Sequence, residues 1–412
     1  MRVLNIFRKY DVENNKIIES LTIDKENFKN KLNMNDDDLY SGFTGIWGLC
    51  FKDISSLDLS DFTAQQLSRI PFSTLTIFPE KSKLPKGYNS KELIQNGLSS
   101  KPKTIRDLHN IGVNGKGITI AVIDKPHPLN HVDFQNVDIE VVDRGIKYKD
   151  DDIEFHGLCV LSALCGKNNG IVTKSKILFY PAQGADTEDK FSYTISTFNE
   201  KLKCLEDILK KLQSGFKIDI VSMSTSFWSC RPVDKKDVES LEEKRYKEIR
   251  KELLKYGCTV ITSDEFWNYN YNYAYKKNNF INVDDYDNYD ESRLEGEKRM
   301  NVLCGGKCYP LIDTVEEYMY DATGSASWAI PIVSGIFALA KQIKNNLTFE
   351  QFTKIAWETS FSNKSGVRFI NPFELCMRLQ KEMIKNEKTR VKWKIALYSA
   401  IFLLNYSAKL LL

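Results

Sequence analysis

The 412-residue sequence has few histidines, no long block of like charge and no glycine-rich phosphate motif. Its net charge of +3 is too small, for a chain of this size, to indicate a nucleic-acid partner. Neither a phosphate-binding Gly-Lys loop nor a dinucleotide glycine pattern follows any expected strand. The sequence therefore argues against nucleic-acid binding and offers no nucleotide-binding motif.

The sequence also shows neither the pattern of a secretion signal nor that of a disulfide framework. Residues 1–11 contain no apolar core followed by a small-residue cleavage site. The nine cysteines are odd in number and scattered, mostly within apolar runs, which favours free thiols in a reducing compartment. Cys304 and Cys308 lie four apart, but no second Cys or His pair stands nearby to complete a metal site. We expect a cytoplasmic protein that needs no metal.

What is present is a hydrophobic content of 42% and an alternation of strand and helix patterns. Short apolar runs read as strands, and longer segments carry apolar residues at helical spacing. This order predicts an α/β fold, a doubly wound and mainly parallel sheet with helices on both faces. The expected strands are 118–123, 177–182, 218–224 and 258–263, and the expected helices include 90–96, 104–111, 198–212 and 235–256.

Two polar residues stand where chemistry gathers in such folds. Asp124 ends an unbroken apolar run, and the carboxyl ends of parallel strands are where ligands bind in open α/β sheets. His156 introduces a compact apolar helix, unlike the other three histidines. Strand-end aspartates also cap loops, so each residue alone has an ordinary structural explanation.

A third candidate is Ser327, which stands near the start of an apolar helix. The following residues, from Ile332 to Ala340, have mostly helical spacing and predict a buried helix. Pro331 is tolerated if it lies in the first turn, where N–H groups have no helical partner. A serine at the positive end of a helix can use backbone N–H groups to stabilise an oxyanion. The other interpretation is a capping serine before a core helix.

Together these segments resemble the subtilisin-like serine proteases. Gly117–Asp124 resembles the family's aspartate motif, His156-Gly157 its histidine motif, and Ser327-Trp328-Ala329-Ile330-Pro331 its serine motif. They stand in the order Asp, His, Ser that this family uses. The resemblance covers roughly residues 105–380. It implies a catalytic triad of Asp124, His156 and Ser327 that requires no metal or organic cofactor, and it places a substrate-binding segment at Ser224, Thr225 and Ser226. That segment is equally readable as an ordinary strand-to-loop turn.

The chain departs from the family pattern near the serine and near the oxyanion donor. Ser325-Ala326 replaces the usual Gly-Thr, and Leu158 replaces a small threonine. The family's oxyanion-hole asparagine has no clear equivalent: Asn268 is the candidate, whereas strict counting reaches Phe266. The implied function is a serine endopeptidase of restricted substrate range acting on a peptide or protein. The alternatives are a catalytically impaired pseudoprotease that binds extended peptides, and a membrane-bound scaffold.

The outer segments predict three parts. Residues 1–104 form a propeptide-like or accessory region, 105–380 the peptidase-like domain, and 381–412 a basic and then apolar tail. Residues 391–412 fit either an anchor on the inner face of the membrane or a helix packed on protein.

Residues 264–301 show no clean period and predict an irregular insertion. The acidic run 150–152 is either a calcium loop or, as the pattern favours, a solvated turn. The sequence leaves the oligomeric state open.

Overall fold

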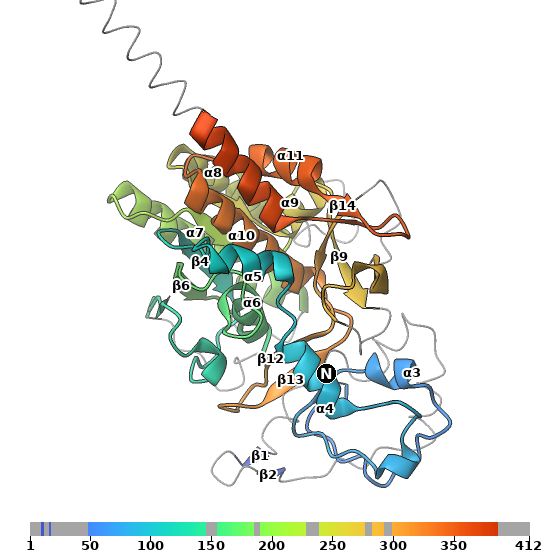
Figure 1. Ribbon diagram of the computed structural model, residues 1–412. Helices are drawn as coiled ribbons and strands as arrows, with labels where there is room; N and C mark the ends of the chain where they lie inside the picture. The colour runs from blue at the N-terminus through green and yellow to red at the C-terminus, as the bar shows by residue number, and fades with distance from the viewer. Residues whose placement is uncertain are drawn as a thin grey trace, which may run out of the picture.

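The computed structural model describes most of the chain, and Figure 1 shows its arrangement. The described residues are 10–11, 16–17, 48–145, 155–184, 190–227, 239–276, 282–291 and 299–385. The tail at 386–412 and the acidic run at 150–152 lie outside them, so the predictions made for these segments stay predictions. At the N-terminus, β1 (Tyr10–Asp11) pairs with β2 (Lys16–Ile17) in an antiparallel arrangement.

The central sheet has five strands, all parallel, in the order β5-β6-β4-β7-β8. These strands are Ile139–Val141, Lys176–Pro181, Thr119–Asp124, Ile220–Ser222 and Thr259–Ile261. Strands β6, β4, β7 and β8 are almost wholly buried, as expected for a sheet covered on both faces. The predicted strands are therefore present, with ends shifted by one or two residues.

Helices cover both faces of this sheet. Ile120 and Val122 of β4 belong to the core beneath α6 (Phe155–Cys165) and α10 (Ala326–Ile343). Ala121 and Ile123 belong to a second core beneath α7 (Lys190–Gln213) and α8 (Leu241–Lys255). Alternate residues of one strand face opposite sides, so β4 contributes to both cores. The prediction of a doubly wound sheet with helices on both faces is confirmed.

The helix predicted over 235–256 begins later than expected. Ser240 accepts a hydrogen bond from Glu243 N and caps the first turn of α8, which starts at Leu241. A serine acceptor satisfies one of the free N–H groups at a helix start. The mostly charged residues before Ser240 gave no local signal for this boundary.

The prediction of an irregular insertion over 264–301 is wrong. The segment supplies α9 (Ser263–Asn268) and three strands of a second five-stranded sheet, in the order β10-β9-β11-β15-β14. These strands are Tyr289–Glu291, Tyr271–Lys276, Met300–Leu303, Arg368–Phe369 and Phe361–Ser362. Tyrosines and asparagines hide the strand pattern, although Tyr271 and Asn272 are both fully buried. Aromatic residues are in fact well suited to strands.

Residues from the N-terminal region share a sheet with the rest of the chain. β3 (Phe72–Ser73) pairs with β13 (Tyr318–Asp321), which pairs with β12 (Lys307–Pro310). A separate apolar cluster joins α3 (Ala64–Ser68) and α4 (Ser90–Leu98) to this hairpin. Figure 1 shows these elements gathered at one end of the molecule. Because β13 leads directly toward Ser327, the N-terminal region supports the strand before the candidate site.

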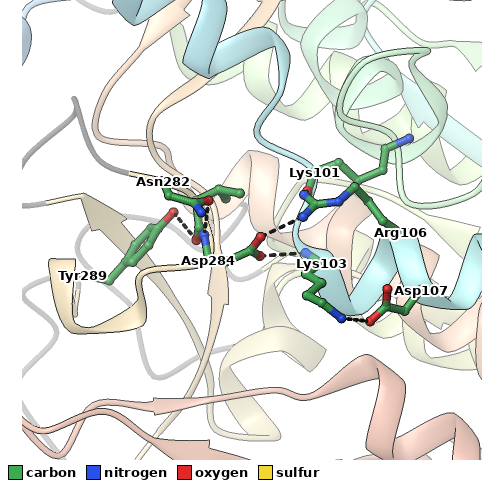
Figure 2. Close-up of polar contacts among 8 residues, drawn as sticks. Lys101, Lys103, Arg106, Asp107, Asn282, Asp284 and Tyr289 are labelled. Atoms are coloured by element: carbon green, nitrogen blue, oxygen red, sulfur yellow. Dashed lines mark hydrogen bonds and ion pairs between the residues drawn. The ribbon is translucent and has the colours of Figure 1, made fainter.

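A polar cluster holds α5 (Lys103–Asn110) against the segment that precedes β10. Asp284 accepts hydrogen bonds from Lys103 N at 2.7 Å and from Arg106 Nη2 at 2.8 Å, as Figure 2 shows. Asp284 thereby satisfies one of the free N–H groups at the amino end of α5. Asn363 of the β14–β15 hairpin donates to Tyr286 O from the other side. These contacts tie residues 282–291 to two distant segments.

The remaining helical elements complete the described chain. The 3₁₀ turns are η3 (Lys81–Lys83), η4 (Val132–Phe134) and η7 (Tyr286–Asn288); α11 spans Phe349–Thr359, and residues 372–385 are helical. Among the described residues, α10 alone has the length and hydropathy of a membrane span, and 78% of it is buried within the protein. Such burial is typical of a core helix.

Candidate active site

Asp124 lies at the carboxyl end of β4 and is almost completely buried. Its Oδ1 accepts a hydrogen bond from Lys125 N at 2.8 Å, which fixes the carboxylate at the strand end. The apolar residues of β4 are buried within the sheet, and the strand ends at Asp124, where the apolar run stops. This hydrogen bond orients the carboxylate independently of His156.

His156, the second residue of α6, pairs with this carboxylate. Its Nδ1 lies 2.6 Å from Asp124 Oδ1, and the imidazole side chain is 25% exposed while that of Asp124 is 5% exposed. Burial acts to raise the pKa of Asp124, but the charge and hydrogen bond of His156, with Lys201 and Lys125 N, outweigh burial and lower the pKa. A carboxylate beside Nδ1 favours the tautomer in which Nδ1 carries the proton and Nε2 accepts.

Gly157 allows His156 to approach Asp124. A Cβ at Gly157 would lie 2.2 Å from Lys125 O and 2.8 Å from His127 Cδ2, so no larger residue fits without a shift of the backbone. The start of α6 therefore packs directly on the loop that follows β4. This close approach explains why glycine follows the histidine.

Ser327 is the second residue of α10 and is partly exposed. Within the described part of the chain, no hydrogen bond joins Ser327 Oγ to His156. The two residues are nevertheless neighbours through Trp328, whose ring centroid lies 5.2 Å from that of His156. Catalytic hydrogen bonds are often long without substrate, so this geometry does not remove Ser327 as a candidate. No acceptor among the described residues bonds Ser327 N–H, as expected in the first turn of a helix.

The helix that carries Ser327 starts earlier than the sequence predicted. Ser325 is its N-cap residue and Ala326 its first residue, so Pro331 lies in the second turn and not in the first. Proline in a helix interior lacks the N–H that would bond the carbonyl four residues before it. For Pro331 that carbonyl belongs to Ser327, and Ser224 Oγ donates to it at 2.7 Å.

The three residues of the predicted substrate-binding segment follow β7, and each of them bonds a protein group. Ser224 bonds the Ser327 carbonyl, while Thr225 O accepts from Ser263 N at 2.9 Å. Ser226 Oγ donates to Asp264 Oδ1. The structure thus brings Ser224 to Ser327 and orders the segment beside the serine.

Among the described residues, no hydrogen bond joins Asn268 to Ser327, so its role as oxyanion donor stays a prediction. Asn268 is the exposed last residue of α9 and lines a pocket with Glu243 and Lys247 of α8. Thr262 and Glu265 form a capping box that starts α9 directly after β8, so Asn268 lies on a helix and not on a loop. Phe266, the position reached by strict counting, is fully buried. Phe266 has no side-chain donor, which leaves Asn268 as the candidate.

Asp321 is a supporting residue that the sequence analysis missed. Its Oδ1 accepts from Thr323 N at 3.0 Å and Gly324 N at 3.1 Å, and its Oδ2 accepts from Trp328 Nε1 at 2.9 Å. The buried carboxylate therefore holds the turn before Ser327 and the indole beside His156. An aspartate six residues before a candidate serine carried no recognised motif, although an aspartate side chain often bonds the backbone N–H two residues further on, as Asp321 does with Thr323.

The described residues contain no group of three His, Cys, Asp or Glu side chains arranged to hold a metal ion. The two closely spaced cysteines face different segments: Cys304 Sγ donates to Ser325 O at 3.2 Å, and Cys308 Sγ to Ile94 O at 3.5 Å. Cys304 thus supports the N-cap residue of α10.

No protein-family model and no curated protein match the chain. Several solved structures are similar to it. The prenylagaramide maturation protease PagA has 12% identity and a TM-score of 0.42, over 67% of this chain and 99% of that chain. The PatG macrocyclase in complex with peptide has 15% identity and a TM-score of 0.46, over 68% of this chain and 96% of that chain. The self-cleaved protease domain of PatA has 14% identity and a TM-score of 0.39, over 64% of this chain and 97% of that chain.

Proposed function

We propose that the protein is a serine endopeptidase that uses Asp124, His156 and Ser327. The observation that carries the proposal is the 2.6 Å pair of Asp124 and His156, beside the helix start that holds Ser327. An aspartate that orients a partly exposed imidazole at the end of a parallel sheet is the arrangement a general base requires. The order and context of the three sequence motifs support the same assignment.

In this proposal His156 Nε2 takes the proton of Ser327 Oγ as the hydroxyl attacks a peptide carbonyl. Asp124 keeps the imidazole in the accepting tautomer and stabilises the imidazolium that forms. The free N–H of Ser327 stabilises the oxyanion. Loss of one oxyanion donor costs on the order of 10²–10³ in turnover, so without a donor from Asn268 we expect a slow enzyme.

The substrate in this proposal is an extended peptide that lies beside Ser224, Thr225 and Ser226. A restricted substrate range fits an enzyme that resides in the cytoplasm. A reducing compartment is supported by the eight described cysteines, which are all free and buried. Attachment to the inner face of a membrane through 391–412 is a further proposal, which rests on the basic and then apolar sequence of that segment.

Labelling with a fluorophosphonate probe tests the proposal. Purified wild type is compared with Ser327→Ala, His156→Ala and, as a matched control, Ser325→Ala, which removes a nearby serine that makes no side-chain capping bond. We expect stoichiometric labelling of wild type and Ser325→Ala, and loss of labelling in the other two. Labelling that survives Ser327→Ala would exclude Ser327 as the nucleophile.

A pseudoprotease is the second candidate, favoured by the absence of a hydrogen bond between Ser327 and His156 in the described structure. A chain lacking residues 1–47 separates an inactive site from one blocked by the N-terminus. This truncation retains β3 and its pairing with β13, whereas removal of 1–104 would delete part of the folded sheet. Labelling regained by the truncated chain supports a blocked peptidase. Continued absence of labelling, with peptide binding retained, supports the pseudoprotease.

A further inference from the structure

A groove of about 680 Å³ opens at the end of the central sheet opposite Asp124. It is bounded by the residues that precede β7 and β8, by the last turn of α10 and by the start of α11. Ser327 and Lys341 lie near opposite ends of α10, about 21 Å apart at 1.5 Å per residue. The groove is therefore separate from the candidate active site, and its occupation would not require peptidase activity.

Lys341 lines this groove and is only 4% exposed. Its ammonium lies 5.5 Å from the centroid of the Phe337 ring. No hydrogen bond and no ion pair to a described carboxylate reaches Lys341 Nζ. A buried charge without a bonded partner is costly, so such a lysine requires an explanation.

The nearby carboxylate of Asp219 does not serve as that partner. Its Oδ2 accepts from Thr119 N at 2.9 Å, and its Oδ1 pairs with Lys217 Nζ at 3.3 Å. Burial lowers the pKa of Lys341, while the charge of Asp219 acts in the opposite direction. An anion bound beside Lys341 would offset this burial and keep the ammonium charged.

The second feature is the amino end of α11, an 11-residue helix that begins at Phe349. Thr348 and Gln351 satisfy each other's N–H groups in a capping box. Phe349 and Glu350 also line the groove, and no acceptor among the described residues bonds their N–H groups. Free N–H groups and the positive end of the helix dipole favour an anion at this position.

We propose that this groove binds an oxyanion, a phosphate or a carboxylate, between Lys341 and the amino end of α11. The other cations of the groove are already paired: Lys217 with Asp219, and Arg250 with Glu265 at 3.1 Å. Lys341 therefore provides the unpaired positive charge. Three exposed apolar side chains line the same groove and suit the carbon skeleton of a larger anion; they are Phe216, Leu254 and Tyr256.

Titration of the full chain with inorganic phosphate tests the proposal, with chloride used to keep the ionic strength constant. Binding is measured by calorimetry and by the midpoint of thermal unfolding. Wild type is expected to bind saturably, and Lys341→Met to bind at least tenfold more weakly. Lys344→Met, three residues further along and outside the groove, is the matched control and should bind like wild type. Acetate in a parallel titration distinguishes a carboxylate site from a phosphate site.

The proposal is overturned if wild type binds neither anion saturably, or if folded Lys341→Met binds phosphate as wild type does. Without phosphate, Lys341→Met should unfold at no lower temperature than wild type, because it removes a buried unpaired charge. If that variant does not fold, Glu350→Gln decides. Removal of this exposed carboxylate should strengthen phosphate binding roughly threefold. Unchanged or weaker binding would contradict an anion site at the start of α11.

Discussion

Ser224 Oγ donates a 2.7 Å hydrogen bond to the main-chain carbonyl of Ser327. In a regular helix that carbonyl would accept from the N–H of residue 331, but Pro331 has none. The hydroxyl of Ser224 therefore replaces a missing helical hydrogen bond at the turn that carries the candidate nucleophile. A proline inside the helix thus couples the segment after β7 to the position of Ser327.

A double-mutant cycle measures this coupling. Ser224→Ala leaves the Ser327 carbonyl without its donor and should cost about 1–2 kcal/mol in the free energy of unfolding. Pro331→Ala restores an N–H that can bond the same carbonyl, so Ser224→Ala should cost about 1 kcal/mol less in that background. Urea unfolding of the four proteins gives the energies. Strictly additive effects would show that Ser224 does not act as the substitute for the proline N–H.

The local patterns around Asp124 and His156 were enough to predict that Asp124 ends a strand and that His156 stands at the start of a helix. An apolar run that ends in Asp124 marks a strand end, and the apolar residues after His156 mark a buried helix. Both signals depend on neighbours in the chain, which a sequence displays directly. The 2.6 Å contact between the two side chains then follows from the parallel sheet that brings the two elements together.

Other features depend on contacts between segments distant in the chain, or on local helix-capping bonds that the sequence pattern did not reveal. The pairing of Phe72 with Tyr320 in β3 and β13 joins residues far apart in sequence. Residues 263–268 form a helix and not part of the expected irregular insertion because Thr262 and Glu265 make a capping box. The start of α10 at Ala326 lies before the predicted one because proline is common in the first helical turn, and Pro331 therefore favoured a later start.

Asp321 should be necessary for the conformation of the serine turn. Asp321→Ala leaves the N–H groups of Thr323, Gly324 and the Trp328 indole without an acceptor, and we expect a loss of about 3 kcal/mol in the free energy of unfolding. Asp321→Asn keeps an oxygen for the backbone donors and should lose about half as much. Denaturant unfolding of both variants checks the order. Equal losses would indicate that the negative charge, and not the acceptor geometry, is what matters.

The contact of Asp284 with α5 should stabilise the protein modestly (Figure 2). The side chains of Arg106 and Asp284 are 45% and 19% exposed, so the ion pair itself should contribute under about 1 kcal/mol. Asp284→Ala also removes the acceptor for Lys103 N and should destabilise more than Arg106→Ala does. Unfolding measurements at low and high salt separate the two effects. Salt should reduce the cost of Arg106→Ala, and a cost that salt leaves unchanged would argue against a charge interaction.

His127 should make stability depend on pH in the weakly acidic range. Burial lowers its pKa to about 4, although Pro128 O and the charge of Asp124 oppose the shift. The unfolded chain, with a histidine pKa near 6.5, therefore binds protons that the folded state does not. Stability is full above pH 6.5 and falls as the pH decreases toward 4, by about 2 kcal/mol between pH 6.5 and 5.

His127→Gln removes this titration and should flatten the profile of unfolding free energy between pH 6.5 and 5. His109 and His131, whose pKa values burial also lowers, should leave a residual slope. His109→Gln is the matched control because its Nε2 contacts Ile171 O, far along the chain from the Asp124 loop. Urea unfolding at half-unit pH intervals measures the three profiles. A His127→Gln profile parallel to wild type would show that the pKa of His127 is the same in the folded and unfolded states, which its packing against the Phe134 and Phe179 rings argues against.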